Sequence, residues 1–408
     1  MIYLREYVLE EGSTLPRLNR FGDYPSMMNQ CVPYWMRRVF PVRDSKRFAV
    51  TLTASRFLIL ALGAISGDVL ANPGSSQVRA IFDEGLYWAG TPPEVDRVLS
   101  RVKKAGFNVY IPCVWHGSGA AWKSSVAPVS RSEVMVAQRD AFGVFLAAAH
   151  RAGIKVVPCF TLALRQGELR PEFTAKSHPD GYFNVQNKAF RRFARDMVLD
   201  FVRRYEIDGL NLDYVRAGQV CSDDDCKRSY FDATGRNLKV DLATYRINSS
   251  AFDALVNWQR VAVKDLVESI SIGARKVRPD LLITVDAAPW FSGYMIQGQD
   301  SLAWSETGTV DLVFSMNYQP QIDWPAMREL QRGLRHPERL VVMVGNYDGE
   351  PPVRPTPRSG SEVARLVHEA ELYNPAGHYA MYIYSLMTEE QVGRLASRPR
   401  RLITAPEL

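Results

Sequence analysis

Asp213 is the first residue in this sequence whose position suggests chemistry, because it lies in IDGLNLDYVR (207–216), a stretch that otherwise resembles a buried strand. Side chains alternate in direction along a strand, so Asn211 and Asp213 share one face and the leucines share the other. Desolvating a carboxylate is costly, and a buried carboxyl group with a shifted pKa is typical of catalytic sites. We therefore predict a catalytic role for Asp213. The alternative is a structural carboxylate paired with Arg216, and Asp208, on the leucine side, is expected to be structural.

A second carboxyl group is required if the chemistry is glycoside hydrolysis. One group donates a proton to the leaving oxygen, and the other attacks the anomeric carbon or activates water. Asp286, in TVDAAPW, is the preferred second candidate because it ends the next predicted strand; the alternative is an N-cap of the following segment. Glu84, in IFDEGLYW, and Asp348 rank behind it, and Glu84 could instead be a charge on the lower wall of the fold.

Eight short apolar runs alternate with amphipathic helical stretches from residue 80 onward. The runs are 80–88, 107–115, 154–164, 207–215, 281–290, 310–319, 340–349 and 378–387. Alternating strands and helices imply right-handed βαβ units and a parallel sheet, and eight units are the number in a (β/α)₈ TIM barrel. We predict this barrel over residues 80–398. A doubly wound open sheet is the alternative, which the lack of a G-x-G-x-x-G or Walker A sequence after the first strand disfavours.

Polar and aromatic residues recur at the predicted C-terminal tips of these strands, where the active sites of such barrels lie. The predicted binding residues are Trp88, Trp115, His116, Asn211, Tyr214, Arg216, Trp290, Asn317, Tyr318, Asn346, Tyr347, Asp348 and Tyr384. Aromatic faces can cover the C–H faces of sugar rings, while amides and acids hold hydroxyl groups. The composition of the tips therefore predicts a carbohydrate site, in which His116 could bond a hydroxyl or tune Asp213. Packing in the core or at the rim is the alternative for each aromatic.

DGLNLDYVR (208–216) resembles the fourth-strand motif of a glycosyl-hydrolase-like family related to glycoside hydrolase family 10, whose members typically have Asp-Gly-Ile-His-Leu-Asp-Tyr-Ile-Arg there. KKAGFNVYIP (103–112), SMNY (315–318) and CKRSYFDATG (226–235) are also similar to segments of that family. The resemblance implies a (β/α)₈ barrel that acts on bacterial cell-surface or cell-wall glycans, with Asp213 as the prime catalytic candidate.

The same stretch is more distantly similar to the Asp-Gly-x-Asp-x-Asp-x-Glu motif of chitinase-type barrels. Asn211 replaces the middle aspartate of that motif, and Val215 replaces its acidic glutamate. These departures argue against a substrate-assisted chitinase mechanism.

The N-terminal region has the features of an export signal. Five basic residues between Arg37 and Arg47 precede the apolar run FLILALGAI, and small residues follow at Val69 and Ala71. The apolar run is shorter than the ~20 residues that span a bilayer, so we predict a signal peptide over 36–71, cleaved after Ala71. An interfacial helix or uncleaved anchor is the alternative. Residues 1–35 would then be an unstructured or misassigned extension, 72–79 a linker and 399–408 a tail, and the mature protein would be periplasmic or extracellular without stable membrane insertion.

The spacing of the cysteines and histidines restricts the possible disulfides and metal sites. Cys221 and Cys226 bracket CSDDDC and are expected to form a disulfide in an exported protein; a zinc site would lack the usual four ligands. Cys113 and Cys159 are expected to be buried thiols. The histidines show no metal-ligand spacing and no Cys–His pair is evident, so no metal or cofactor is predicted, and the acids at 223–225 are expected to form a solvated loop.

The net charge of +6 does not indicate a nucleic-acid partner. Residues 1–71 carry nine Lys and Arg against six Asp and Glu, which leaves 41 against 38 in the remainder. No basic stripe with interleaved aromatic residues is present. The predicted partner is a carbohydrate polymer, and the predicted function is hydrolysis of its glycosidic bonds. A catalytically inactive polysaccharide-binding barrel and a non-hydrolytic carbohydrate enzyme, such as a lyase or deacetylase, are the alternatives.

Overall fold

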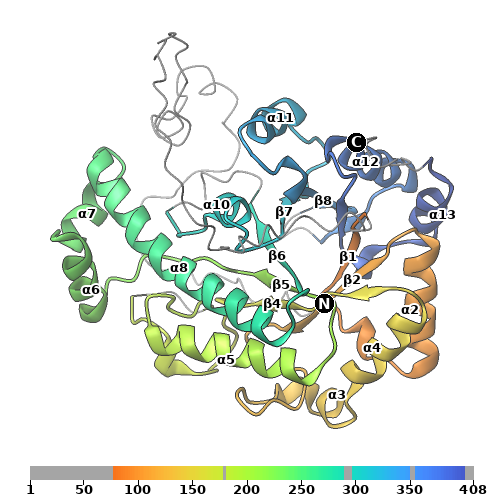
Figure 1. Ribbon diagram of the computed structural model, residues 1–408, viewed down its shortest axis with the longest axis horizontal. Coiled ribbons are helices and arrows are strands. Elements are labelled where there is room, and N and C mark those ends of the chain that lie inside the picture. The colour runs from red at the N-terminus through yellow and green to blue at the C-terminus, as the bar shows by residue number, and fades with distance from the viewer. Residues whose placement is uncertain (1–76, 178–180, 289–295, 350–353, 400–408) are drawn as a thin grey trace, which may run out of the picture. The chain divides into compact units, whose positions relative to one another are not determined.

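The computed structural model describes residues 77–177, 181–288, 296–349 and 354–399 (Figure 1). Residues 77–408 belong to one compact unit. The predicted extension and signal peptide, most of the predicted linker, Trp290, and all but the first residue of the predicted tail lie outside the described residues. No helix in the described ranges is both long and apolar enough to cross a membrane.

The strands form a closed parallel barrel, which confirms the predicted (β/α)₈ architecture. They are β1 (Arg79–Asp83), β2 (Val109–Trp115), β3 (Lys155–Val156), β4 (Cys159–Thr161), β5 (Gly209–Asp213), β6 (Leu282–Ala287), β7 (Leu312–Asn317), β8 (Leu340–Gly345) and β11 (Tyr379–Tyr382). Closure follows from β1, which pairs with both β11 and β2. β3 and β4 both pair with β2, so they are two halves of one barrel strand, interrupted around Pro158.

Helices surround the barrel (Figure 1). They are α2 (Pro92–Lys104), α3 (Val134–Gln138), α4 (Ala141–Arg151), α5 (Lys188–Arg204), α6 (Asp224–Thr234), α7 (Leu238–Thr244), α8 (Ser249–Val277), α10 (Ser301–Glu306), α11 (Trp324–Arg332), α12 (Gly360–Tyr373) and α13 (Glu389–Ser397). Local sequence fixes several helix starts: α2 and α13 begin with capping boxes at Thr91 and Thr388, and Asn187 caps α5. Each device satisfies backbone N–H groups that the first turn leaves unpaired.

Short 3₁₀ helices and one hairpin complete the described elements. The 3₁₀ helices are η1 (Tyr87–Ala89), η2 (Arg131–Glu133), η3 (Pro171–Phe173), η4 (Pro337–Arg339) and η5 (Tyr384–Leu386), and β9 (Tyr347–Asp348) pairs with β10 (Thr356–Pro357). α6 and α7 belong to the connection after β5 and pack on α8 through Tyr230, Leu238 and Trp258. This connection, together with the one after β4, enlarges the C-terminal end of the barrel.

The apolar core has two layers, as the alternation of strand side chains requires. One cluster fills the barrel interior and includes Phe82, Ile111, Phe314 and Met343. The larger cluster lies between the strands and the surrounding helices. Consequently a residue near a strand tip reaches the barrel mouth only if it lies on the inward face.

Phe201 in α5 tests how much the apolar layer between the strands and the helices contributes to stability. Its ring is fully buried, with ring centroids 4.9 Å from Trp122, 4.7 Å from Phe142 and 5.4 Å from Phe160. We expect Phe201→Ala to lower the free energy of unfolding by ~3–5 kcal/mol, because it removes buried apolar surface and leaves a cavity. Phe231→Ala in α6 is the matched control, since that ring is 60% exposed. Urea denaturation of both variants measures the difference, and equal losses would contradict this account of the core.

Candidate active site

Asp213 is the last residue of β5 and lies on the inward face with Asn211, as the sequence predicts. Its side chain is buried, and its carboxylate accepts the backbone N–H of Tyr214 at 2.6 Å. Arg216 Nη1 lies 3.8 Å from the same oxygen, and the guanidinium carbon lies 4.2 Å from the centre of the Tyr214 ring. Tyr214 has a φ of 51°, in the left-handed region that is uncommon for a non-glycine residue. The three residues that follow Asp213 therefore provide its carboxylate with a hydrogen-bond donor and a cation.

The pKa of Asp213 reflects two opposing influences. Burial raises the pKa above the ordinary aspartate value, while Arg216, the Tyr214 N–H and His116 lower it again. The cation and hydrogen bond favour the ionised form. The net shift of the Asp213 pKa is upward, and Arg216 and the Tyr214 N–H oppose it by favouring the carboxylate.

Asp286 is the immediate neighbour of Asp213. Leu212 pairs with Val285, so the next residues on β5 and β6 lie side by side. Asn211 Nδ2 donates to Asp286 Oδ1 at 2.9 Å, which holds the group inside the barrel. Burial raises the pKa of Asp286 well above its ordinary value, and the charge of Asp213 raises it further. Two close carboxyl groups in a low-dielectric site do not both ionise readily, so the upward shift favours the protonated form of Asp286.

Glu84 directly follows the last residue of β1 and is half-buried. The structure corrects the expectation that it could lie on the lower wall, because it sits at the C-terminal end of the barrel. Burial raises the pKa of Glu84 to about 7; Cys113 and Asp213 also raise it, whereas His116 and a hydrogen bond from Tyr382 lower it. A carboxyl group with a pKa near 7 is suited to general acid catalysis. Glu84 is thus a better acid candidate than Asp286, the reverse of the ranking from sequence.

Tyrosines form one wall of the mouth beside Glu84. Tyr318 and Tyr382 are stacked, with ring centroids 4.7 Å apart and planes 19° apart, and Tyr347 lies 6.2 Å from Tyr382. All three are half-buried, so part of each ring remains accessible. An aromatic wall next to carboxyl groups is suited to holding a sugar ring.

Three predicted binding aromatics lie in the outer core, which corrects their expected placement: Trp88, Trp115 and Tyr384. Trp88 is fully buried and packs against Phe142 with ring centroids 5.6 Å apart. Trp115 packs against Phe193, and Tyr384 packs against Tyr110. Their positions near strand tips are as predicted, but their side chains point towards the helices.

The side chains of two asparagines that were predicted to bind substrate also form hydrogen bonds within the fold instead. Asn317 lies on the opposite face of β7 from Tyr318 and donates to Ser315. Asn346 is fully buried; it donates to the Ile383 carbonyl and accepts the Ile383 N–H, so it ties two strand ends together. The structure therefore gives both amides structural roles.

Asp348, in β9, has an ion-pair partner outside the cluster of carboxyl groups in the barrel mouth. It forms an ion pair with Arg358 at 2.7 Å, and its own side chain is 51% exposed. This ion pair closes the β9–β10 hairpin, and Arg358 also donates to the Gly345 and Tyr318 carbonyls. The binding or catalytic role of Asp348 stays a prediction.

The barrel contains a Cys–His pair, although no such pair is evident in the sequence. Cys113 Sγ is 3.4 Å from His116 Nδ1, and both side chains are buried. Strict alternation would place residues 113 and 116 on opposite faces of β2. A register shift between Cys113 and Trp115 changes the phase, so Trp115 turns outward and His116 turns inward. The C-x-x-H spacing at a strand tip was the only available signal.

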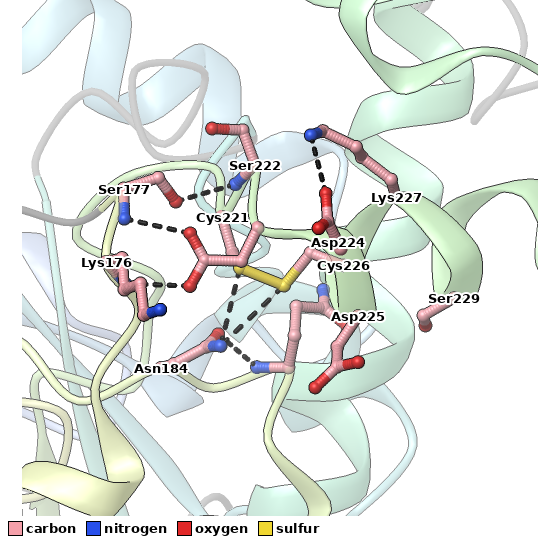
Figure 2. The surroundings of a disulfide bond; sticks show 12 residues. Lys176, Ser177, Asn184, Cys221, Ser222, Asp224, Asp225, Cys226, Lys227 and Ser229 are labelled. Carbon is pink, nitrogen blue, oxygen red and sulfur yellow. Dashed lines mark hydrogen bonds and ion pairs between the residues drawn. A yellow bond between two sulfur atoms is a disulfide. The ribbon is translucent and has the colours of Figure 1, made fainter.

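Cys221 and Cys226 form the predicted disulfide, in the connection that follows Arg216 (Figure 2). Asn184 Nδ2 approaches the two sulfurs at 3.4 and 3.7 Å. Asp223 accepts the backbone N–H groups of Lys176 and Ser177 at 2.7 and 2.9 Å. The disulfide and these hydrogen bonds join the connections after β4 and β5 into one wall at the C-terminal end of the barrel.

A polar groove of about 750 Å³ lies against this wall, lined by residues that include Asn184, Gln186, Asp225 and Ser229. Within the described ranges, no group of three or more His, Cys, Asp or Glu is arranged to hold a metal ion. The lining includes amide, hydroxyl and carboxyl side chains, which are groups that bind sugar hydroxyls, together with Lys188 and Arg228.

The geometry defines a (β/α)₈ barrel with a carboxyl-rich, tyrosine-walled mouth at its C-terminal end. The chain belongs to the glycosyl hydrolase-like 10 family, whose profile matches residues 91–333. Glycosyl hydrolase DigH of Escherichia coli is 22% identical over 277 residues, which cover 57% of this chain and 58% of that protein. The chain therefore spans less than two thirds of this curated relative.

Solved structures share the fold. The PgaB (BpsB) glycoside hydrolase domain from Bordetella bronchiseptica superposes with a TM-score of 0.59 at 13% identity, covering 79% of this chain and 98% of that one. A cold-adapted β-galactosidase from Rahnella sp. R3 has a TM-score of 0.54 at 15% identity, covering 76% and 50%. These likenesses concern the barrel alone, and the family match supports a glycosidase-like function.

Proposed function

We propose that this protein is a glycoside hydrolase that cleaves a bacterial cell-wall or extracellular polysaccharide, with Glu84 as general acid and Asp213 as the ionised carboxylate. One observation carries the proposal: a single barrel mouth contains carboxyl groups in different environments, since burial raises the pKa of Glu84 to about 7 while Arg216 and the Tyr214 N–H favour the ionised form of Asp213. Such a difference in environment assigns acid and base roles within one site. Family membership supports the reaction class, and the name of the Escherichia coli relative supports hydrolysis.

Each group has a distinct part in the proposed reaction. Glu84, protonated below its pKa of about 7, donates its proton to the glycosidic oxygen as the bond to the leaving sugar breaks. Asp213, kept anionic by Arg216 and the Tyr214 N–H, either attacks the anomeric carbon or activates water. Asp286 stays neutral and, with Asn211, supports the position of Asp213. Tyr318 and Tyr382 would pack against a sugar ring.

Export is part of the proposal because it places the enzyme with its substrate. The basic and apolar N-terminal pattern has the features of a signal peptide. The Cys221–Cys226 disulfide supports an oxidising compartment. The polar groove along the disulfide-bonded wall supports a polymeric substrate, since it lies at the same end of the barrel as the mouth.

The direct test uses the full-length chain on a panel of bacterial glycans, namely peptidoglycan strands with and without peptide stems and β-linked amino-sugar polymers. Released reducing ends measure cleavage, and binding is measured in parallel. We expect cleavage of at least one polymer by the wild type and none by the double variant Glu84→Gln/Asp213→Asn. Binding without cleavage across the panel would instead identify a polysaccharide-binding barrel.

The pH profile of the cleavage reaction is the second test. Activity requires protonated Glu84 and ionised Asp213, so kcat/KM should fall on both sides of an optimum. The alkaline limb should lie near pH 7, where Glu84 loses its proton, and the acidic limb should lie above the ordinary aspartate pKa, because burial raises that of Asp213. Tyr382→Phe removes a hydrogen bond that lowers the pKa of Glu84, so the alkaline limb should move to higher pH. An unmoved limb would contradict the assignment of Glu84.

A further inference from the structure

The contact between Cys113 and His116 lies beside Glu84, since Asp83 is the register partner of Pro112, and it has no part in the mechanism above. Cys113 is 1% exposed and His116 is 9% exposed. Cys113 Sγ lies 3.4 Å from His116 Nδ1, so a proton can be shared along this line. Cys159 is the register partner of Cys113 on the neighbouring strand β4 and contacts it through its own thiol.

Carboxyl groups from three further elements act on the His116 ring. Glu84 follows β1, Asp213 ends β5, and Glu133 lies in η2, where it is 6% exposed. Each interacts electrostatically with His116. A positive ring at this position would therefore lie among the three acids, and it would stabilise the ionised form of each.

The proton distribution within the pair agrees with this geometry. Burial alone raises the pKa of Cys113, but the hydrogen bond from Cys159 and the proximity of His116 outweigh it and bring the pKa to about 6. Burial alone lowers the pKa of His116, but Cys113, Glu84 and Glu133 outweigh it and bring the pKa to about 9. Near neutral pH the proton therefore belongs to the imidazole.

We infer that Cys113 and His116 form a thiolate–imidazolium pair, and that Cys113 is a positioning residue that fixes this cation beside Glu84 and Asp213. The proton moves from Cys113 Sγ to His116 Nδ1, and no other reactant is needed. This inference deepens the proposed function and rests on it for its catalytic consequence. The pair itself has a test that does not require a substrate.

That test is the titration of His116 by NMR in the full-length chain with ¹⁵N-labelled histidine, with the resonance assigned from His116→Gln. We expect the ring to stay protonated to about pH 9 in the wild type. Cys113→Ser keeps nearly the same shape but does not ionise in this range, so the pKa of His116 should fall by about one unit or more. Ile111→Val, on the same inward face of β2, is the control and should leave the titration unchanged. An ordinary pKa in the wild type, or no change in Cys113→Ser, would overturn the inference.

The catalytic consequence is read from the pH dependence of kcat/KM. Cys113→Ser removes the thiolate, whose charge raises the pKa of Glu84 by more than the charge of His116 lowers it. The alkaline limb for Cys113→Ser should therefore move to lower pH. If Cys113 had a merely structural role, the variant would have a lower kcat/KM at its optimum but an unmoved limb. That result would overturn the positioning role.

The two proposals fail in different ways. Wild-type protein that cleaves no glycan would count against the proposed hydrolase, while the NMR titration would still decide whether the ion pair exists. If cleavage depends on Asp213 but the alkaline limb does not move in Cys113→Ser, the proposed hydrolase stands. Cys113 would then have no part in its catalytic site.

Discussion

Asp213→Asn is expected to reduce the rate of glycan cleavage by about 10³-fold or more, while the glycan still binds. The substitution keeps the shape of the side chain and its hydrogen bond from Tyr214, but it removes the negative charge that the reaction needs at the anomeric carbon. Reducing-end release gives kcat, and binding of the same polymer by titration calorimetry gives the affinity. A charge needed mainly in the transition state lowers kcat more than it weakens binding.

Asp208→Asn is the matched control for this variant. Asp208 immediately precedes β5, at the opposite end of the strand, where its carboxylate accepts the Val156 N–H at 2.8 Å and lies 2.9 Å from His150 Nε2. We expect a modest effect on stability and wild-type cleavage by this variant. Equal losses in the two variants would mean that Asp213 acts through the fold, and an active Asp213→Asn would remove it from the reaction.

Glu84→Gln is expected to produce the second large effect, a loss of about 10²–10³-fold in kcat on polymers whose leaving group is a sugar. Glutamine keeps the size of the side chain but has no proton to donate to the glycosidic oxygen. An aryl glycoside with an acidic phenol needs little protonation, so the loss on such a substrate should be much smaller. Kinetics on a series of leaving groups therefore test the acid role directly.

Asp286→Asn distinguishes the two candidates for the second carboxyl group. Because Asp286 is held neutral beside Asp213, an amide reproduces its charge and can still accept from Asn211. We expect this variant to stay within about tenfold of the wild type, as for a residue that supports the site without transferring a proton. A loss as large as that of Glu84→Gln, with the same dependence on the leaving group, would transfer the acid role to Asp286.

The inward direction of Asp213 could be predicted because it depends on alternation within one strand. The outward direction of Trp115 could not be predicted, because a register shift in β2 changes the phase of alternation just before the strand tip. The same shift produced the Cys113–His116 contact. For Trp88 and Tyr384, proximity to a tip was mistaken for access to the mouth, although the apolar layer between strands and helices also needs large aromatic side chains there.

The sequence by itself determined the eight strand–helix units, the inward face of β5 and the disulfide, because each depends on residues close together in the chain. Periodicity, capping residues and a five-residue cysteine spacing are local signals. Only the tertiary structure raises the pKa of Glu84 to about 7 and that of Asp286 well above its ordinary value, since both shifts follow from the burial and the charges that closure of the barrel brings together. Burial and electrostatic coupling depend on neighbours from β1, β2, β5 and β11, and no single segment of the sequence contains them.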